Sequence, residues 1–366
     1  MQDVKQCKSV EDMIKFAQNL GHKDPSFARV ETKANEVVDP TTNANWYDAY
    51  GMTNAIKDMS VKNGSLISAL SGSFEGGNLP DSYPVPYDIT TYKMKAKTVQ
   101  RDKGRPTSVA KAMTDAKGTI TPKALICQFD INDEMIANST DKQIYDYVVR
   151  KATESARNSM ENMIINGDTE AGATGNVNSD DQLPATTFTD GNSDDSLLID
   201  HGIRESAINN SMTVDVGAFD SDDLLTMIAK MSSVYQNQVS ELMFIFNPQT
   251  YIKAQADDAL KLAYATRNAT IDGGQMKPYG IQTIVNDYVP KTEADGKVCK
   301  TAGNNTLGQI LLVYKPAIRW GFGKEVLVET ERVQGYGFEI TVTMKFGFVI
   351  LDATHNCVAG INVTVA

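Results

Sequence analysis

The sequence lacks the short motifs that mark most enzymes and metalloproteins. It has no G-x-x-x-x-G-K-[ST] phosphate loop, no G-x-S-x-G nucleophile turn and no H-E-x-x-H zinc helix. Its three histidines, His22, His201 and His355, lie in three separate segments. Histidines placed so are more often solvated or hydrogen-bonded than catalytic. We therefore predict no enzymatic activity, no cofactor and no metal site.

Paired cysteines and long apolar runs are also missing. The four cysteines lie far apart and form no C-x-x-C, which predicts reduced thiols and disfavours a zinc site or a disulfide framework. No stretch approaches the ~18 to 20 apolar residues of a membrane span. The first residues lack the apolar region of a signal peptide. We expect a chain that is not exported and does not contact a membrane.

Charge is distributed unevenly along the chain, whose net charge is -11. Residues 168–223 contain 13 Asp and Glu but a single base, Arg204, whereas residues 93–123 contain nine Lys and Arg and only two Asp. Such segments can attract one another across a subunit boundary and fix the register of assembly. The residues that we expect to make contacts between subunits are Lys93, Lys95, Lys97, Arg101, Lys103, Arg105, Lys111, Lys117, Asp180, Asp181, Asp190, Asp194 and Asp195.

Two other uses of the charged segments stay open. The basic segment has one aromatic residue, Tyr92, near its base, so it could contact phosphates of a nucleic acid but not read a sequence. Residues 190–195, "DGNSDD", begin with the alternating spacing of a calcium loop. However, Asp195 stands where a glycine should turn the chain, and His201 stands where a glutamate should close it. An irregular calcium site is the alternative to a solvated acidic loop.

The hydrophobic periodicity predicts an α+β protein. Residues 140–165 follow the helical period for about seven turns, and Asn166 with Gly167 should end the helix in a left-handed cap. Ser221 should open a second helix, followed by a buried strand at 242–246 and mostly strands from 280 onward. Because no βα unit repeats, Rossmann-like and barrel folds are disfavoured.

The N-terminal part predicts fewer core elements. A short amphipathic helix is expected at 9–20, and 39–88 should be an extended arm in which 71–88 forms no core element. Strands at 89–99 and 118–131 should form a long hairpin with a bend near Pro122. A hairpin of this kind needs a surface to lie against.

Four stretches, taken in order, resemble the major capsid protein of tailed bacteriophages, which has the HK97-type fold. They are "LICQFDINDEMIANST", "MENMIINGDT", "ELMFIFNPQTYIKA" and "PYGIQTIVNDYVP". The resemblance covers about residues 60–366 and rests on the order of these features. Thr169 and Gln282 depart from the glycine and proline common at those places in the family.

The resemblance implies a division of the chain, and it makes the helix-end corner, formed by Asn166, Gly167 and Asp168, the ending of the spine helix. The parts implied are an N-terminal helix and arm (1–88), an E-loop hairpin (89–131), a spine helix with the start of a peripheral domain (132–167), an acidic insertion (168–220), an axial domain (221–307) and C-terminal strands returning to the peripheral domain (308–366).

In function, the resemblance implies a structural protein and no enzyme. Copies would assemble as hexamers and pentamers into an icosahedral virion shell around double-stranded DNA, in the cytoplasm of the bacterial host. The implied partners are other copies of the chain, a separate scaffolding protein, a portal and, as an open alternative, decoration proteins. DNA would be contacted without sequence specificity.

Two other interpretations remain. An encapsulin, a cellular compartment with the same fold, would enclose an enzyme in place of DNA. A β-rich surface or adhesion protein would suit the abundant Ser, Thr and Asn, but it predicts an export signal and tandem modules, and neither is found in this sequence.

Overall fold

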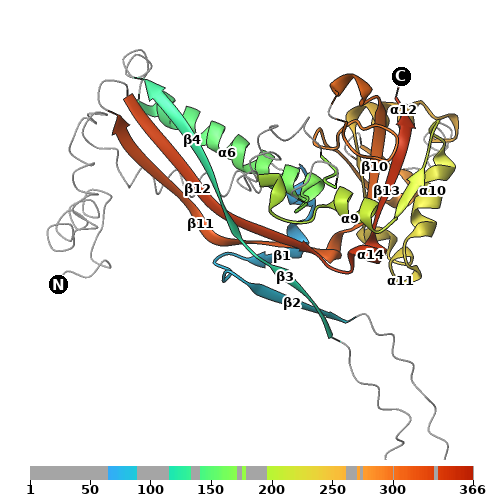
Figure 1. The fold of residues 1–366 in the computed structure, drawn as a ribbon. Helices are drawn as coiled ribbons and strands as arrows, with labels where there is room; N and C mark the ends of the chain where they lie inside the picture. Colours follow the sequence, from blue (N-terminus) through green and yellow to red (C-terminus); the bar gives the residue numbers. More distant parts are fainter. Residues whose placement is uncertain are drawn as a thin grey trace, which may run out of the picture. The chain divides into compact units, whose positions relative to one another are not determined.

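The computed structural model describes residues 65–88, 115–132, 141–170, 175–178, 196–260, 270–272, 275–299, 301–333 and 337–365, drawn in colour in Figure 1. The chain divides into two compact units. The described residues of unit one come from Ala124–Asn158 and Lys324–Lys345, and those of unit two come from Gly64–Lys123, Ser159–Gly323 and Phe346–Ala366. Both helices and strands are present, which confirms the α+β class.

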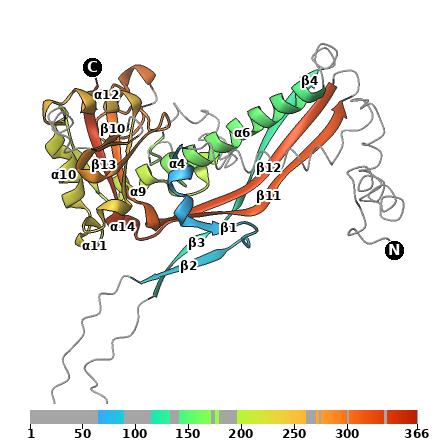
Figure 2. The same ribbon diagram turned by 180° about the vertical axis from the view of Figure 1, so that it is seen from behind.

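The described residues of unit one are most of a long helix and parts of three strands of a four-stranded sheet, whose remaining strand belongs to unit two. The helix α6 (Asp141–Asn166) confirms the predicted 140–165 helix. The sheet has the order β1-β11-β12-β4, and its strands are β1 (Phe74–Gly76), β11 (Ile318–Val333), β12 (Gly337–Ile350) and β4 (Lys123–Asn132). Within unit one, α6 runs beside β4 and β12 in both views (Figures 1 and 2).

The core of unit one follows from two hydrophobic periods. On α6 the buried residues Val148, Val149, Ala152 and Ala156 recur every three or four positions. On β12 the buried residues alternate with partly exposed ones, as at 340, 342 and 344. Each element therefore presents one apolar face, and these faces form the core.

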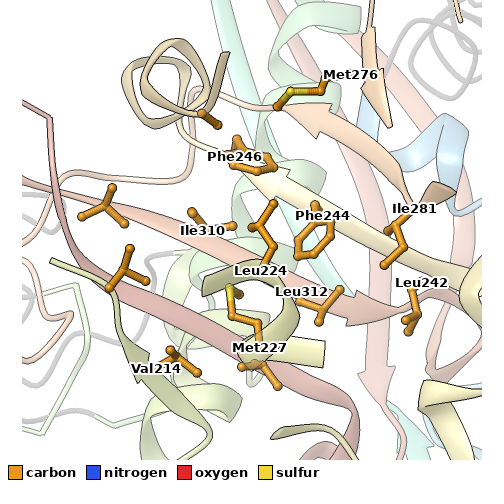
Figure 3. Close-up of a cluster of buried hydrophobic side chains, with 14 of the residues drawn as sticks. Val214, Leu224, Met227, Leu242, Phe244, Phe246, Met276, Ile281, Ile310 and Leu312 are labelled. Carbon is orange, nitrogen blue, oxygen red and sulfur yellow. The ribbon is translucent and has the colours of Figure 1, made fainter. Parts of the chain in front are cut away.

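Unit two contains a five-stranded sheet of the order β5-β13-β10-β6-β9. Its strands are β5 (Thr213–Asp215), β13 (Cys357–Thr364), β10 (Leu307–Tyr314), β6 (Leu242–Phe246) and β9 (Gln282–Val285). All five residues of β6 are buried, as the apolar run "LMFIF" predicts for a central strand. Figure 3 shows Leu224 and Met227 meeting Phe244 and Leu312 in this core.

The helices of unit two begin at well-formed caps. The helix α10 (Ser221–Lys230) is capped by Asp220, whose side chain accepts a hydrogen bond from the N–H of Asp222. The carboxylate of Asp223 in turn accepts from the N–H of Asp220. The helix begins at Ser221, as expected, and Asp220 supplies its cap. The helix α12 (Pro248–Ala256) is capped by Asn247.

Shorter elements complete the described chain. The helices are α4 (Ser65–Ala69), α9 (Ile203–Asn209), α11 (Ser233–Gln236) and α14 (Ala353–Asn356), with 3-10 turns at Ser71–Ser73, Ser196–Leu198, Val239–Glu241, Pro278–Gly280, Ala302–Asn304 and Lys315–Ala317. The remaining strands are β2 (Tyr83–Asp88), which pairs with β3 (Asp115–Ile120), and β7 (Thr270–Asp272), which pairs with β8 (Gln275–Lys277). None of the described helices is long and apolar enough to cross a membrane.

The expectation that residues 71–88 form no core element is wrong. They supply β1 and β2, and Leu79 and Val85 pack in a buried cluster with Ile120 and Leu351. The strand β2 contains two prolines, which usually indicate that a segment is not a strand. Proline is nevertheless tolerated in a strand where its missing N–H has no ladder partner.

The hairpin is present but starts earlier than expected. Its base is the antiparallel pair β2 and β3, in register from Tyr83 opposite Ile120 to Asp88 opposite Asp115. The expected strand at 89–99 lies outside the described residues, as does the helix at 9–20. The bend near Pro122 is confirmed, since β3 ends at residue 120 and β4 begins at residue 123.

The expectation that residues 308–366 all return to one sheet is wrong. The strands β11 and β12 lie in the four-stranded sheet, but β10 and β13 belong to the five-stranded sheet. The physical reason is visible in the burial, because six consecutive residues of β10 are buried and such a strand needs cover on both faces.

The expected acidic insertion at 168–220 is also too long. Within it α9 and β5 belong to unit two, and β5 pairs with β13, with Thr213 opposite Ala359. Residues 196–220 are therefore part of the fold, while 171–174 and 179–195 lie outside the described residues.

Two adjacent leucines of α10 test the assignment of the core. We expect Leu224→Ala to lower the free energy of unfolding by about 2–5 kcal/mol, because Leu224 is fully buried and its removal leaves a cavity. The matched control Leu225→Ala should change it by less than about 0.5 kcal/mol, because Leu225 is 43% exposed. Urea unfolding measures both. Equal losses would contradict the described packing.

Candidate assembly elements and the helix-end corner

Of the charged residues expected to make contacts between subunits, Lys117 is the one that falls among the described residues. It is exposed on β3, opposite Pro86 of β2, at the base of the hairpin. The other charged candidates lie outside the described residues. The expected attraction between the basic and acidic segments therefore stays a prediction.

The helix-end corner is described in full. The helix α6 ends at Asn166 as expected, but the left-handed cap is wrong, because neither Asn166 nor Gly167 has a positive φ. A glycine is needed at position 167 because a larger residue would not fit. A Cβ there would lie 2.4 Å from the carbonyl oxygen of Asp200. Gly202 approaches equally closely, and its N–H donates to the carbonyl of Gly167 at 2.7 Å.

The buried side chain of Arg204, in α9, fills the centre of this corner. It is 0% exposed, and each N–H of its guanidinium points at an acceptor in the chain. The acceptors are Gln309 Oε1 at 2.9 Å from Nε, Asn166 Oδ1 at 2.8 Å and Asn178 Oδ1 at 3.0 Å from Nη1, and the carbonyls of Val177 at 3.2 Å and Gly296 at 3.1 Å from Nη2. One side chain thus joins five acceptors from four segments of the chain.

The charge of Arg204 is maintained despite its burial. Burial lowers the pKa of Arg204 to about 9, and the nearby carboxylate of Asp168 opposes this shift. At neutral pH the guanidinium therefore remains protonated. A buried cation without acceptors would be costly, and here the hydrogen bonds offset that cost.

Asp168 and its neighbours fold the chain back on itself after α6. The Asp168 carboxylate accepts the N–H of Glu170 at 2.9 Å and that of Val177 at 2.8 Å. Burial nevertheless raises the pKa of Asp168. Asn178 Nδ2 donates to the carbonyl of Asn166 at 2.6 Å, which closes the turn. The corner is therefore a satisfied polar centre.

Next to this centre lie three side chains that could hold a metal ion. The ligand atoms of Asp168, His201 and Glu205 all lie within 4.8 Å of one another. His201 Nδ1 is 3.1 Å from Glu205 Oε1, and this hydrogen bond raises the pKa of His201. The sequence analysis predicts no metal site and missed this group, because Asp168 is far from the other two in sequence. The one available signal was the i, i+4 spacing of His201 and Glu205.

Asp200 supplies a further carboxyl group beside the corner. Burial raises its pKa to about 7, while the charge of Lys123 opposes the shift. Lys123 Nζ also donates to the carbonyl of Ile199 at 3.4 Å. The first residue of β4 is thus linked to the loop that precedes α9.

Comparison with known proteins identifies the architecture. No family model and no curated protein matches the chain. A chain of the satellite phage P4 procapsid that includes the size determination (Sid) protein aligns with a TM-score of 0.55 at 10% identity, over 86% of this chain and 99% of that chain. A chain of Gordonia phage Cozz aligns with a TM-score of 0.50 at 14% identity, over 80% of this chain and 85% of that one.

The chain has the HK97-type fold of phage capsid proteins. The fold expected from the four sequence stretches is thereby confirmed. At these identities the likeness shows the capsid fold alone.

The buried arginine gives a sharp test of the corner. Arg204→Met should lower the free energy of unfolding by about 3–5 kcal/mol, because it leaves buried acceptors without donors and Asp168 without its neighbouring cation. The control Arg150→Met, at an exposed position of α6, should cost less than about 0.5 kcal/mol. Chemical denaturation compares them, and a small loss for Arg204→Met would show that the centre is not needed.

The close approach at the corner predicts an intolerant glycine. Gly167→Ala should destabilise the protein by about 1–3 kcal/mol, because the new methyl group meets backbone atoms of Asp200 and Met163 that cannot move aside freely. Gly303→Ala is the control, since a Cβ there has nothing within 4 Å. The midpoints of thermal unfolding measure the difference, and equal midpoints would contradict the packing.

Proposed function

We propose that this chain is the major capsid protein of a tailed bacteriophage and assembles into hexamers and pentamers of an icosahedral shell around double-stranded DNA. The observation that supports this most directly is the structural likeness to the P4 procapsid chain, which extends over 86% of this chain. The protein acts as a structural component of the virion, assembled in the bacterial cytoplasm, and has no enzymatic role.

The described elements suit the parts of such a subunit. The helix α6, with 26 residues and a length of about 39 Å, serves as the spine helix. The four-stranded sheet beside it belongs to the peripheral domain, and the five-stranded sheet forms the axial domain. The ribbon of β2 and β3, with the residues that connect them, serves as the E-loop.

The E-loop needs a partner outside its own subunit. Its base is anchored, because Val85 and Ile120 pack against Leu351 in unit two. Beyond Asp88 and Asp115 the connecting sequence is polar and basic, and a two-stranded ribbon alone is marginally stable in water. The connecting residues therefore lie on a neighbouring subunit.

Electrostatic complementarity directs this contact. The basic residues between Lys93 and Lys117 face the acidic residues between Asp180 and Asp195 of a neighbouring copy. The acidic segment points away from the packaged DNA, because the phosphates would repel it. A separate scaffolding protein, a portal and decoration proteins complete the particle.

Microscopy of the expressed protein tests this function. Negative-stain images and light scattering should show uniform shells or capsomers of five or six chains. A clean monomer at all concentrations would contradict the proposal. The cargo of purified particles distinguishes the alternatives, since long DNA indicates a phage capsid and an enclosed enzyme indicates an encapsulin.

The charge contact predicts a compensating pair of variants. Reversing Lys93, Lys95 and Lys97 to glutamate should slow assembly, and adding Asp190→Lys, Asp194→Lys and Asp195→Lys should restore it, because the attraction is re-formed with opposite sign. Raised salt should slow assembly of the unmodified protein by screening the same charges. Light scattering against time measures the rates. Failure of the combined variant to recover would reject this pairing while leaving the capsid function itself untouched.

A further inference from the structure

The corner brings three metal-ligating side chains together from two separate segments. Asp168 follows the end of α6, and His201 and Glu205 lie before and within α9. Their ligand atoms all lie within 4.8 Å of one another, a spacing that one ion could bridge with small side-chain movements.

The surrounding hydrogen bonds hold two of the three ligands in place. Backbone N–H groups of Glu170 and Val177 fix the Asp168 carboxylate, and Asn209 Nδ2 donates to Glu205 Oε1 at 2.8 Å. Groups that orient ligands in this way are typical of metal sites. The His201 side chain is 59% exposed, and its Nε2 lies 3.1 Å from the Thr169 hydroxyl oxygen. An ion would replace the hydrogen bond that Nδ1 makes to Glu205.

The electrostatics of the group favour a cation. The carboxylates of Asp168 and Glu205 are buried, with residue exposures of 1% and 7%, and they lie close together. The guanidinium of Arg204 donates none of its hydrogen bonds to either of them, because its N–H groups have other acceptors. Buried carboxylates are normally paired or coordinate a metal. Among the described residues, the ion-pair partner of Glu205 is His201, and Asp168 accepts from backbone N–H groups.

The sequence that joins Asp168 to His201 is acidic. Residues 169–200 contain seven Asp and Glu and no Lys or Arg. Asp200, the last of them, is close enough to His201 to raise its pKa. A segment of one sign of charge raises the local concentration of cations.

We propose that Asp168, His201 and Glu205 bind a divalent transition-metal ion of the zinc class. One imidazole nitrogen and two carboxylate oxygens suit Zn²⁺, Mn²⁺ or Co²⁺, whereas Ca²⁺ and Mg²⁺ prefer oxygen ligands throughout. The ion would join the end of α6 to the start of α9 and close the acidic segment between them as a loop. The site belongs to one chain and does not depend on assembly.

Zinc binding to the untagged full-length protein tests the proposal. Isothermal titration with Zn²⁺ should show one saturable site per chain. His201→Ala should weaken binding by about tenfold or more, and Glu205→Gln should weaken it similarly, because each removes a ligand. His355→Ala is the matched control, since His355 also pairs with a carboxylate, that of Asp352 at 2.7 Å, but is not part of the three-ligand group.

Cobalt supplies an independent readout. Co²⁺ added to the unmodified protein should give visible absorption of a low-coordination site, and His201→Ala should abolish it while His355→Ala should retain it. No saturable Zn²⁺ binding, or equal binding by the unmodified protein and the His201→Ala variant, would overturn the site. Since these measurements need no shell, they are separate from the test of the capsid function.

Discussion

The hydrogen bonds of one buried guanidinium hold the centre of unit two together. Arg204 has no exposed surface, and its N–H groups reach the end of α6, the turn at Val177 and Asn178, Gly296 and the side chain of Gln309 in β10. These segments share no continuous secondary structure. Because the acceptors are buried, removal of the donor leaves several of them unsatisfied at once. The position of the helix end against the five-stranded sheet follows from this constraint.

A capsid subunit has a use for such a rigid corner. In the proposed function the spine helix and the axial sheet must keep one geometry in every copy, while the E-loop is completed by a neighbour. The described chain divides in this way: the corner is satisfied internally, whereas the ribbon of β2 and β3 has an anchored base and a polar extension. In the same proposal, charges of opposite sign on the basic and acidic segments set the register between copies.

Much of the fold could be predicted from sequence, and the failures have identifiable causes. The run "LMFIF" and the periodicity of 140–165 predict β6 and α6, because burial leaves a clear pattern in one stretch of chain. The distribution of β10 and β13 to one sheet and of β11 and β12 to another could not be predicted, because local pattern does not encode strand partners. At the corner, the sequence predicts the residue at which α6 ends but not the backbone conformation there. Gly167 is needed for its close contact with Asp200, which lies far along the chain.

The residues of the corner show the same contrast between local pattern, which the sequence reveals, and distant contacts, which it does not. Arg204 was visible as the lone base of an acidic segment, but its acceptors come from four other segments and no spacing reveals them. The group of Asp168, His201 and Glu205 was missed for the same reason. The contact role of the candidate basic residues of the hairpin stays a prediction from composition, since all of them except Lys117 lie outside the described residues.

Amide hydrogen exchange of Arg204→Met against the unmodified protein tests most directly whether the guanidinium holds the corner. Peptides that contain Asp168, Val177 and Val298, whose N–H groups bond within or beside the corner, should exchange faster in the variant. Peptides from β6 at the centre of the sheet should keep their protection. Unchanged exchange at the corner, or an equal increase everywhere, would contradict the role assigned to Arg204.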